Sequence, residues 1–160
     1  MRKIKKKYRR PFHPWEKERI EEEKLIMKEY GFKNKKEIWK INSILKKIKD
    51  LAKKLIASTG KQAELEKAQL FARLERLGLI APGARLDDIL TLEPKQLYEK
   101  RLQTLVFKKG LAKTIKQARQ CITHKHIAIG DKIYSSPNYL VPKNEEPLIG
   151  FAKSSVLAKK

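Results

Sequence analysis

The stretch that decides the fold of this chain is Gly110–Lys132, GLAKTIKQARQCITHKHIAIGDK. Its first part carries apolar residues at helical spacing, and its last part alternates around Gly130-Asp131 in the manner of a tight hairpin. Five basic residues and two histidines accompany a single acid, Asp131. A short helix with a cationic face that leads directly into a hairpin indicates a small module that binds a polyanion.

The charge of the whole chain is extreme for its size. Its 160 residues carry a formal net charge of +21, with an isoelectric point near 10.1. Residues 1–60 hold 20 basic and 8 acidic residues, residues 61–100 hold 7 of each, and residues 101–160 hold 12 and 3. A coat of lysines that serves only solubility would mix the signs more evenly. We therefore expect both basic ends to contact the phosphates of a nucleic acid.

Cysteine content and hydropathy exclude several classes of protein. One cysteine, Cys121, cannot make a disulfide framework within a single chain or a cysteine-based zinc site, and it favours a reducing, cytoplasmic setting. No apolar run approaches the roughly 18–20 residues that span a bilayer, and the basic N-terminus lacks the apolar segment of a secretory signal. The chain is expected to need no cofactor and no metal.

Helical periodicity dominates the first 110 residues. The pattern predicts helices at Pro14–Tyr30, Asn34–Ser58 and Gln62–Leu77, then a loop with a short turn, then a helix that begins near Pro94 and stops at Gly110. Asn34 and Glu37 have the spacing of a capping box at the start of the second helix. Trp15 and Trp39 are expected in the core, and the alternative that they face RNA as stacking platforms stays open.

Strands are expected only after the next helix, which Thr114 should cap. The segment 127–134 predicts a hairpin, and segments 138–141 and 148–151 predict two further short strands. The fold class is α+β: an N-terminal helical region followed by a helix-helix-hairpin RNA-binding module with a small, mostly antiparallel sheet. The expected segments are a basic arm at 1–13, a helical domain at 14–100, the RNA-binding module at 101–146, and a C-terminal strand with a basic tail at 147–160.

The helix after Thr114 is predicted to have an apolar face and a polar, cationic face. A fixed array of cations at this spacing suits the phosphates of folded RNA. The arm adds cations interleaved with aromatic residues, which suits phosphate contact with occasional stacking. The predicted RNA-binding residues of the module are Arg101, Lys108, Lys109, Lys113, Thr114, Lys116, Arg119, Gln120, His124, Lys125 and His126, and those of the arm are Lys5, Lys7, Tyr8, Arg9, Arg10 and His13.

Three other kinds of site compete for the same stretch. Catalysis by His124 and His126 needs a nearby carboxylate or nucleophile, and Asp131, the one local acid, suits the hairpin turn better. A zinc site of Cys121 and the two histidines has the wrong spacing and lacks a fourth ligand. Helix-turn-helix DNA binding fits the short basic helix, but the hairpin that follows at once is untypical of it. Catalytic residues and metal ligands are therefore not expected.

The segment Arg101–Val141, RLQTLVFKKGLAKTIKQARQCITHKHIAIGDKIYSSPNYLV, resembles the RNA-binding module named after the ribosomal protein S-four family. The shared pattern is Arg101-Leu102, Gly110-Leu111-Ala112, Ala118-Arg119, His124 with His126, and Pro137. The stretches HPWEKERIEEE, EYGFKNKKEIWK, RLERLG and LDDIL resemble the archaeal and eukaryotic branch, so the resemblance covers nearly all of residues 1–157. Many members have glycine where this chain has Lys125.

This resemblance implies a specific, non-enzymatic function. Such proteins are structural constituents of the small ribosomal subunit that bind its ribosomal RNA early, organise the subunit body around a multi-helix junction, and support translational accuracy. They adjoin ribosomal proteins of the S-five and S-twelve families and lie near the messenger RNA entrance. Two alternatives stay open: a stand-alone, ribosome-associated RNA chaperone with the same module, and an RNA-modifying enzyme, for which no catalytic acid or nucleophile can be nominated.

Overall fold

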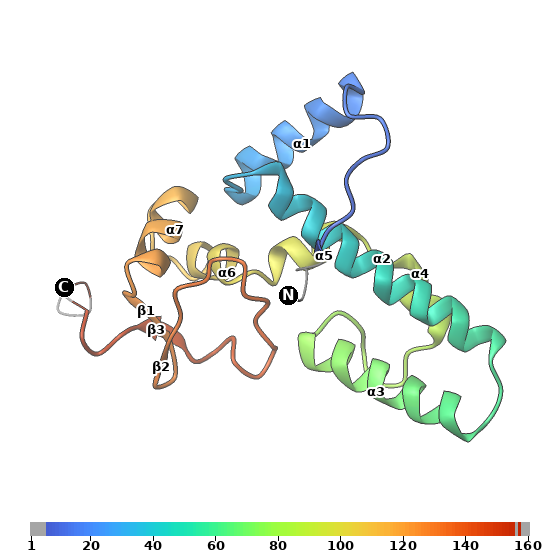
Figure 1. Ribbon diagram of the computed structural model, residues 1–160. Coiled ribbons are helices and arrows are strands. Elements are labelled where there is room, and N and C mark those ends of the chain that lie inside the picture. The colour runs from blue at the N-terminus through green and yellow to red at the C-terminus, as the bar shows by residue number, and fades with distance from the viewer. Residues whose placement is uncertain (1–5, 156, 158–160) are drawn as a thin grey trace, which may run out of the picture.

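The structure is a computed structural model that describes residues 6–155 and 157, so the predicted contact residue Lys5 lies outside the described residues. The elements in chain order are α1 (Lys17–Tyr30), α2 (Lys35–Ala57), α3 (Lys61–Leu77), α4 (Leu86–Thr91), α5 (Pro94–Glu99), α6 (Leu102–Lys108), α7 (Ile115–Thr123), β1 (Ile127–Ile129), β2 (Lys132–Ile133) and β3 (Ile149–Phe151). Helices α1 to α5 form one half, and α6, α7 and the sheet form the other, beside it (Figure 1). The predicted α+β class is confirmed.

The long helix α2 organises the helical half. Its apolar residues recur every three or four positions, and that stripe packs against α3, α4 and α5. Ile38, Ile48 and Ala52 are almost completely buried in this cluster, together with Leu74 of α3 and Leu97 of α5. Burying each large aliphatic side chain contributes about 1.5–3 kcal/mol, so this stripe is the main stabiliser of the helical half.

The second half contains the stretch Gly110–Lys132 and is called the module below. Helices α6 and α7 pack on each other and on the sheet, and they bury Val106 and Ile122 with Ile127 of β1. The strand order is β2-β1-β3 and both pairings are antiparallel. Thr114 Oγ1 accepts a hydrogen bond from the backbone N–H of Gln117 at 3.1 Å. The predicted helix cap and hairpin are both confirmed.

The chain between the halves differs from its prediction. The expected single helix after Pro94 is two helices, because Arg101 adopts an extended backbone and forms an isolated β-bridge with Leu140. The backbone N–H of Leu102 donates to the carbonyl of Tyr139 at 2.8 Å, which completes this crossing. Segment 138–141 makes only that bridge and is not a strand. Segment 80–90, predicted as a loop, contains most of the short helix α4.

Two predictions about the N-terminal helices are wrong. Asn34 begins α2 without a side-chain cap, and the carboxylate of Glu37 pairs with Arg119 of the module, so the predicted capping box does not form. Helix α1 begins at Lys17, so Trp15 lies ahead of it and is 91% exposed rather than in the core. Trp39 is half-buried, and its Nε1 donates to Glu23 at 2.9 Å.

The described part of the arm lies along α2 rather than projecting from the molecule (Figure 1). The backbone N–H of Arg9 donates to Ser43 Oγ at 2.9 Å. The rings of Tyr8 and Trp39 have centroids 6.1 Å apart. Near the start of α1, Arg19 donates to the carbonyls of His13 at 3.0 Å and Pro14 at 2.8 Å. The arm is therefore attached to both helices that it passes.

Gly31, between α1 and α2, supplies a test of how the halves fit together. Its φ is +63°, and a Cβ there would lie 2.6 Å from Gln103 Nε2. Gly31→Ala is expected to lower the free energy of unfolding by about 2–4 kcal/mol, because left-handed strain of about 1 kcal/mol adds to the displacement of a buried amide. Denaturant unfolding measures the loss.

The matched control is Gly130→Ala. Gly130 has a φ of +59°, but a Cβ there meets nothing within 4 Å. This variant should lose only the strain, about 1 kcal/mol. Equal losses in the two variants would contradict a close fit of Gly31 against the module.

Candidate RNA-binding surface

The two halves are joined by one carboxylate and two guanidinium groups. Glu37 of α2 accepts from Arg119 of α7 at 2.7 Å (Nη2 to Oε1) and 3.1 Å (Nη1 to Oε2), which is a bidentate pair. Arg101 Nη2 lies 3.5 Å from Glu37 Oε2. The side chain of Glu37 is only 11% exposed, so these charges meet largely out of water. The ion pairs therefore fix α7 against the start of α2.

Arg101 has no exposed surface. Its guanidinium donates to the carbonyl of Tyr30 at 3.2 Å and to Asn138 Oδ1 at 2.6 Å, and it lies 3.8 Å from the ring centroid of Phe32. Burial lowers the pKa of Arg101 to about 10 despite the opposing effect of Glu37, and the group remains a cation at neutral pH. The prediction that Arg101 contacts RNA is wrong for this structure, because these partners enclose the whole side chain.

Gln103 completes the junction between the halves. Its Nε2 donates to the carbonyl of Gly31 at 3.0 Å and to that of Ile115 at 2.9 Å, and its Oε1 accepts from Arg119 at 3.4 Å. Sequence reasoning missed both Gln103 and Glu37 as junction residues. A glutamine within an apolar helix was the available signal for the first, whereas the capping-box spacing explained the second equally well.

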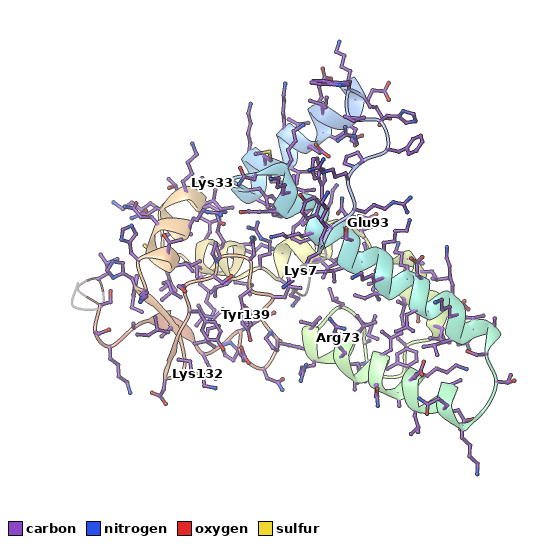
Figure 2. All side chains as sticks on the ribbon, viewed as in Figure 1. Lys7, Lys33, Arg73, Glu93, Lys132 and Tyr139 are labelled. Carbon is purple, nitrogen blue, oxygen red and sulfur yellow. The ribbon has the colours of Figure 1, made fainter. Side chains whose placement is uncertain are left out.

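A groove of about 580 Å³ opens beside this junction, between the end of α1 and α7. Phe32 and Ile115 supply apolar lining, and Lys28, Lys33 and Lys116 supply positive charge. Figure 2 shows Lys33 at this meeting of α1 and α7. Two of the three lysines come from the helical half, so the cationic surface of α7 continues across the junction. Sequence reasoning missed both, because their place beside α7 depends on tertiary packing.

Most of the predicted contacts on α7 and at its two ends are exposed, and they are called the α7 surface below. Lys113, Lys116, Gln120, His124 and Lys125 are all exposed. The guanidinium of Arg119, by contrast, is hydrogen-bonded to Glu37, and this contact holds α7 in place. Such an arrangement can bind phosphate and sugar groups along one RNA strand.

The remaining predicted residues of the module have other partners or roles. Lys108 Nζ lies 3.2 Å from a carboxylate oxygen of Glu99, and Lys109 Nζ donates to the carbonyl of Ile149 at 3.4 Å. His126 is half-buried, and its Nδ1 lies 2.9 Å from Ser155 Oγ. Lys108 ends α6 and Lys109 follows it, so neither lysine belongs to α7.

Lys125 has an unusual backbone. It is the one non-glycine residue with positive φ, +62°, in the described chain. It follows α7 in a Schellman motif, in which the N–H groups of Lys125 and His126 donate to the carbonyls of Ile122 and Cys121. At comparable turns after α1 and α3 the chain uses glycine, Gly31 and Gly78. Lys125 therefore places a positive charge after α7, and its left-handed backbone conformation is strained.

The arm forms a second cationic surface together with α2. Lys7 and Arg9 line a groove of about 390 Å³ with Lys46 and Lys47. Further toward α1, Arg10 lines another groove of about 360 Å³ with Lys35, Lys36, Arg19 and aromatic or proline side chains. The sequence predicted phosphate contacts for the arm, but not that the arm would lie against the lysines of α2. The structure thus presents cations in two separate places.

The described residues contain neither a cluster of metal-ligating side chains nor a membrane-spanning helix. No group of three or more histidine, cysteine, aspartate or glutamate side chains is placed to hold a metal ion there. None of the described helices has the length and apolar character needed to cross a membrane. Asp131 lies in the hairpin turn and contacts Lys153 at 3.0 Å, and Cys121 is buried.

The Glu37 junction can be tested by Glu37→Gln. Burial alone would raise the pKa of Glu37, but hydrogen bonds and charge from Arg119, with charge from Arg101, hold it below its ordinary value. The substitution leaves two guanidinium groups without a counter-charge and should lower the free energy of unfolding by about 3 kcal/mol at pH 7. Because the folded pKa is lowered, this stabilisation is full above the ordinary pKa of 4.5 and disappears as pH falls through the folded value.

Denaturant unfolding of wild type and variant at pH 7 and in acid measures both effects. Glu64→Gln on the exposed surface of α3 removes the same charge and is the matched control, with an expected change within about 0.5 kcal/mol. A difference between wild type and Glu37→Gln that stayed constant down to acid pH would contradict the ion-pair account.

Two protein-family models match the chain. The model described as the ribosomal protein S4/S9 N-terminal domain matches residues 1–99, and the model described as the S4 domain matches residues 100–146. Together they cover nearly all of the chain, on either side of the crossing at Arg101.

Several archaeal proteins named small ribosomal subunit protein uS4 are similar over almost their whole length. The protein of Ignicoccus hospitalis is 48% identical over 159 residues, which are 99% of this chain and 96% of that protein. The protein of Methanococcus aeolicus is 48% identical over 158 residues, 98% of this chain and 89% of the relative. That of Methanothermobacter thermautotrophicus is 42% identical over 158 residues, 99% and 92% of the two chains.

Proposed function

The chain belongs to the ribosomal protein S4 family, and from that premise we propose that it is a structural constituent of the small ribosomal subunit that binds ribosomal RNA. The observation that carries the proposal is the groove between the end of α1 and α7, where lysines from both halves surround an apolar lining. The Glu37 ion pairs hold α7 against the start of α2, and so set the spacing of the backbone segments that carry these lysines. A preformed cationic array suits a folded RNA, whose phosphates also have fixed spacing.

The finer parts of the proposal follow the family resemblance. The protein binds RNA early, helps nucleate assembly of the subunit body and supports translational accuracy. It works in the cytoplasm on the ribosome, without catalysis, beside proteins of the S-five and S-twelve families and near the messenger RNA entry channel. Two cationic surfaces on different parts of one chain support this role, because such a chain can hold more than one RNA segment.

The proposed organisation is a basic arm at 1–13, a helical domain at 14–100, an RNA-binding module at 101–146, and a C-terminal strand with a basic tail at 147–160. Two separate buried clusters support a boundary near Arg101. One contains residues between Tyr30 and Tyr98, and the other contains residues between Leu102 and Ile149. Strand β3 pairs with β1, so the C-terminal segment completes the sheet of the module.

The alternative, a stand-alone RNA chaperone, predicts loose binding to many RNAs. The two proposals separate when the protein is titrated with a junction fragment of its small-subunit ribosomal RNA and with an unrelated structured RNA of equal length. At physiological salt or above, the structural proposal predicts a preference for the junction of about a hundredfold or more. Equal affinities that fall together with added salt would favour the chaperone.

The same titration tests the α7 surface through the double variant Lys113→Ala/Lys116→Ala. Both lysines are exposed, so folding should be unaffected. Each lost phosphate contact should lower the slope of log affinity against log salt by about 0.7–0.9. The double variant Lys61→Ala/Lys95→Ala removes two exposed lysines from the electrically neutral middle and is the control. If both double variants lowered the salt slope equally, RNA binding would depend on the net charge of the protein and not on the α7 surface.

Lys125→Gly should separate stability from binding. Removing left-handed strain of about 1–2 kcal/mol outweighs the entropic cost of glycine, about 0.5–1 kcal/mol, so the free energy of unfolding should rise by about 0.5–1 kcal/mol. Affinity for the junction RNA and its salt slope should both fall, because a phosphate contact is lost. Thermal unfolding and the RNA titration measure the two effects. Unchanged RNA affinity would remove Lys125 from the proposed contacts.

A further inference from the structure

Two aromatic side chains are exposed to solvent at the turn between the arm and α1. Phe12 is 87% exposed and Trp15 is 91% exposed. The ring of Phe12 meets that of His13 edge to face, with centroids 4.7 Å apart and planes at 87°. Phe12 and Trp15 lie three residues apart on the turn before α1. Exposed large aromatic rings on one short segment mark a contact surface, because their apolar faces gain free energy only when something covers them. Phe12 and Trp15 are not part of the α7 surface.

The backbone that carries these rings is held in place. Arg19 Nη2 donates to the carbonyls of His13 and Pro14 at 3.0 and 2.8 Å, and its Nη1 donates to Glu23 at 2.7 Å. Pro14 itself restricts the backbone between the two aromatic residues. A ligand that covered the rings would therefore pay little of the ordering entropy that a loose tail requires.

The charges around the turn favour RNA as the ligand. The arm and the adjacent face of α2 form a cationic path that leads up to it, as Figure 1 shows for the course of the arm. The nearest acids are partly neutralised: Glu16 lies 3.5 Å from Arg19 Nε, and Glu23 is buried against Arg19 and Lys35. Glu18 is exposed and follows Lys17. The cations of this path are Lys6, Lys7, Arg9, Arg10, Lys35, Lys36, Lys46 and Lys47.

We propose that Phe12 and Trp15 form a stacking platform for unpaired bases of an RNA strand whose phosphates lie along the arm and α2. A cationic path that ends in exposed aromatic rings is the arrangement by which proteins bind single-stranded nucleic acid, because every base has a face that stacks. Paired bases in a helix do not offer that face, so the platform selects single-stranded RNA. The inference rests on the proposed RNA binding but concerns a surface separate from α7.

The test uses the full chain, a short oligouridine and a blunt-ended RNA duplex, followed by tryptophan fluorescence. Stacking should quench Trp15 when the oligouridine is added and leave it unchanged with the duplex. Trp15→Ala should weaken oligouridine binding by about tenfold without altering the salt slope, since no cation is removed. Trp15→Phe should retain the affinity and lose the quenching, which leaves half-buried Trp39 as the remaining fluorophore.

Leu25→Ala is the matched control, since Leu25 is an exposed apolar residue of α1 that has no ring. It should bind oligouridine like wild type. The platform is overturned if Trp15→Ala binds oligouridine as tightly as wild type, or if it loses duplex binding as much as oligouridine binding. Either result would point to a protein as the partner of these rings. Junction binding that still depends on Lys113 and Lys116 would then show that the proposed function survives. Failure to bind either junction or oligouridine would overturn both.

Discussion

The rest of the structure depends on a carboxylate shared between two arginines. Glu37 comes from the helical half, and Arg101 and Arg119 come from the module, so the attraction acts between the start of α2 and the module. Two guanidinium groups so close together would repel each other in a largely dry interior without it. The Glu37 carboxylate between them offsets this repulsion and joins the module to α2. Ion pairs of this kind have a defined geometry, whereas hydrophobic contact is non-directional.

Several neighbouring residues fit closely around this attachment. Gly31 leaves room for the amide of Gln103, and Phe32 lies against the Arg101 guanidinium. One nitrogen of that guanidinium, Nε, is buried without a hydrogen-bond partner among the described residues, which is a cost in stability. A chain with a net charge of +21 already destabilises its compact state through self-repulsion. Both costs are consistent with a protein whose arrangement serves a polyanionic partner.

Charge and strain are concentrated where RNA contact is proposed. The cationic groups lie beside α7 and along the arm, whereas the two buried clusters that form the cores consist of hydrophobic residues. Lys125 keeps a backbone conformation that glycine adopts at the ends of α1 and α3. Hydrophobic burial therefore determines the two halves, and electrostatics determines how they are joined and what they present to solvent.

The sequence by itself determined the α+β class, the long helix α2, the cap at Thr114 and the hairpin at Gly130-Asp131, because each depends on local spacing or turn chemistry. It also placed cations at both ends of the chain. Only the tertiary structure decided that Arg101 is buried, that Glu37 pairs with arginines instead of capping its helix, and that Trp15 stands open. These outcomes depend on residues more than 60 positions apart in sequence, as in the bond from Arg101 to Tyr30 with a separation of 71, or on where a helix begins. Periodicity carries no information about such distant partners, and only packing brings them together.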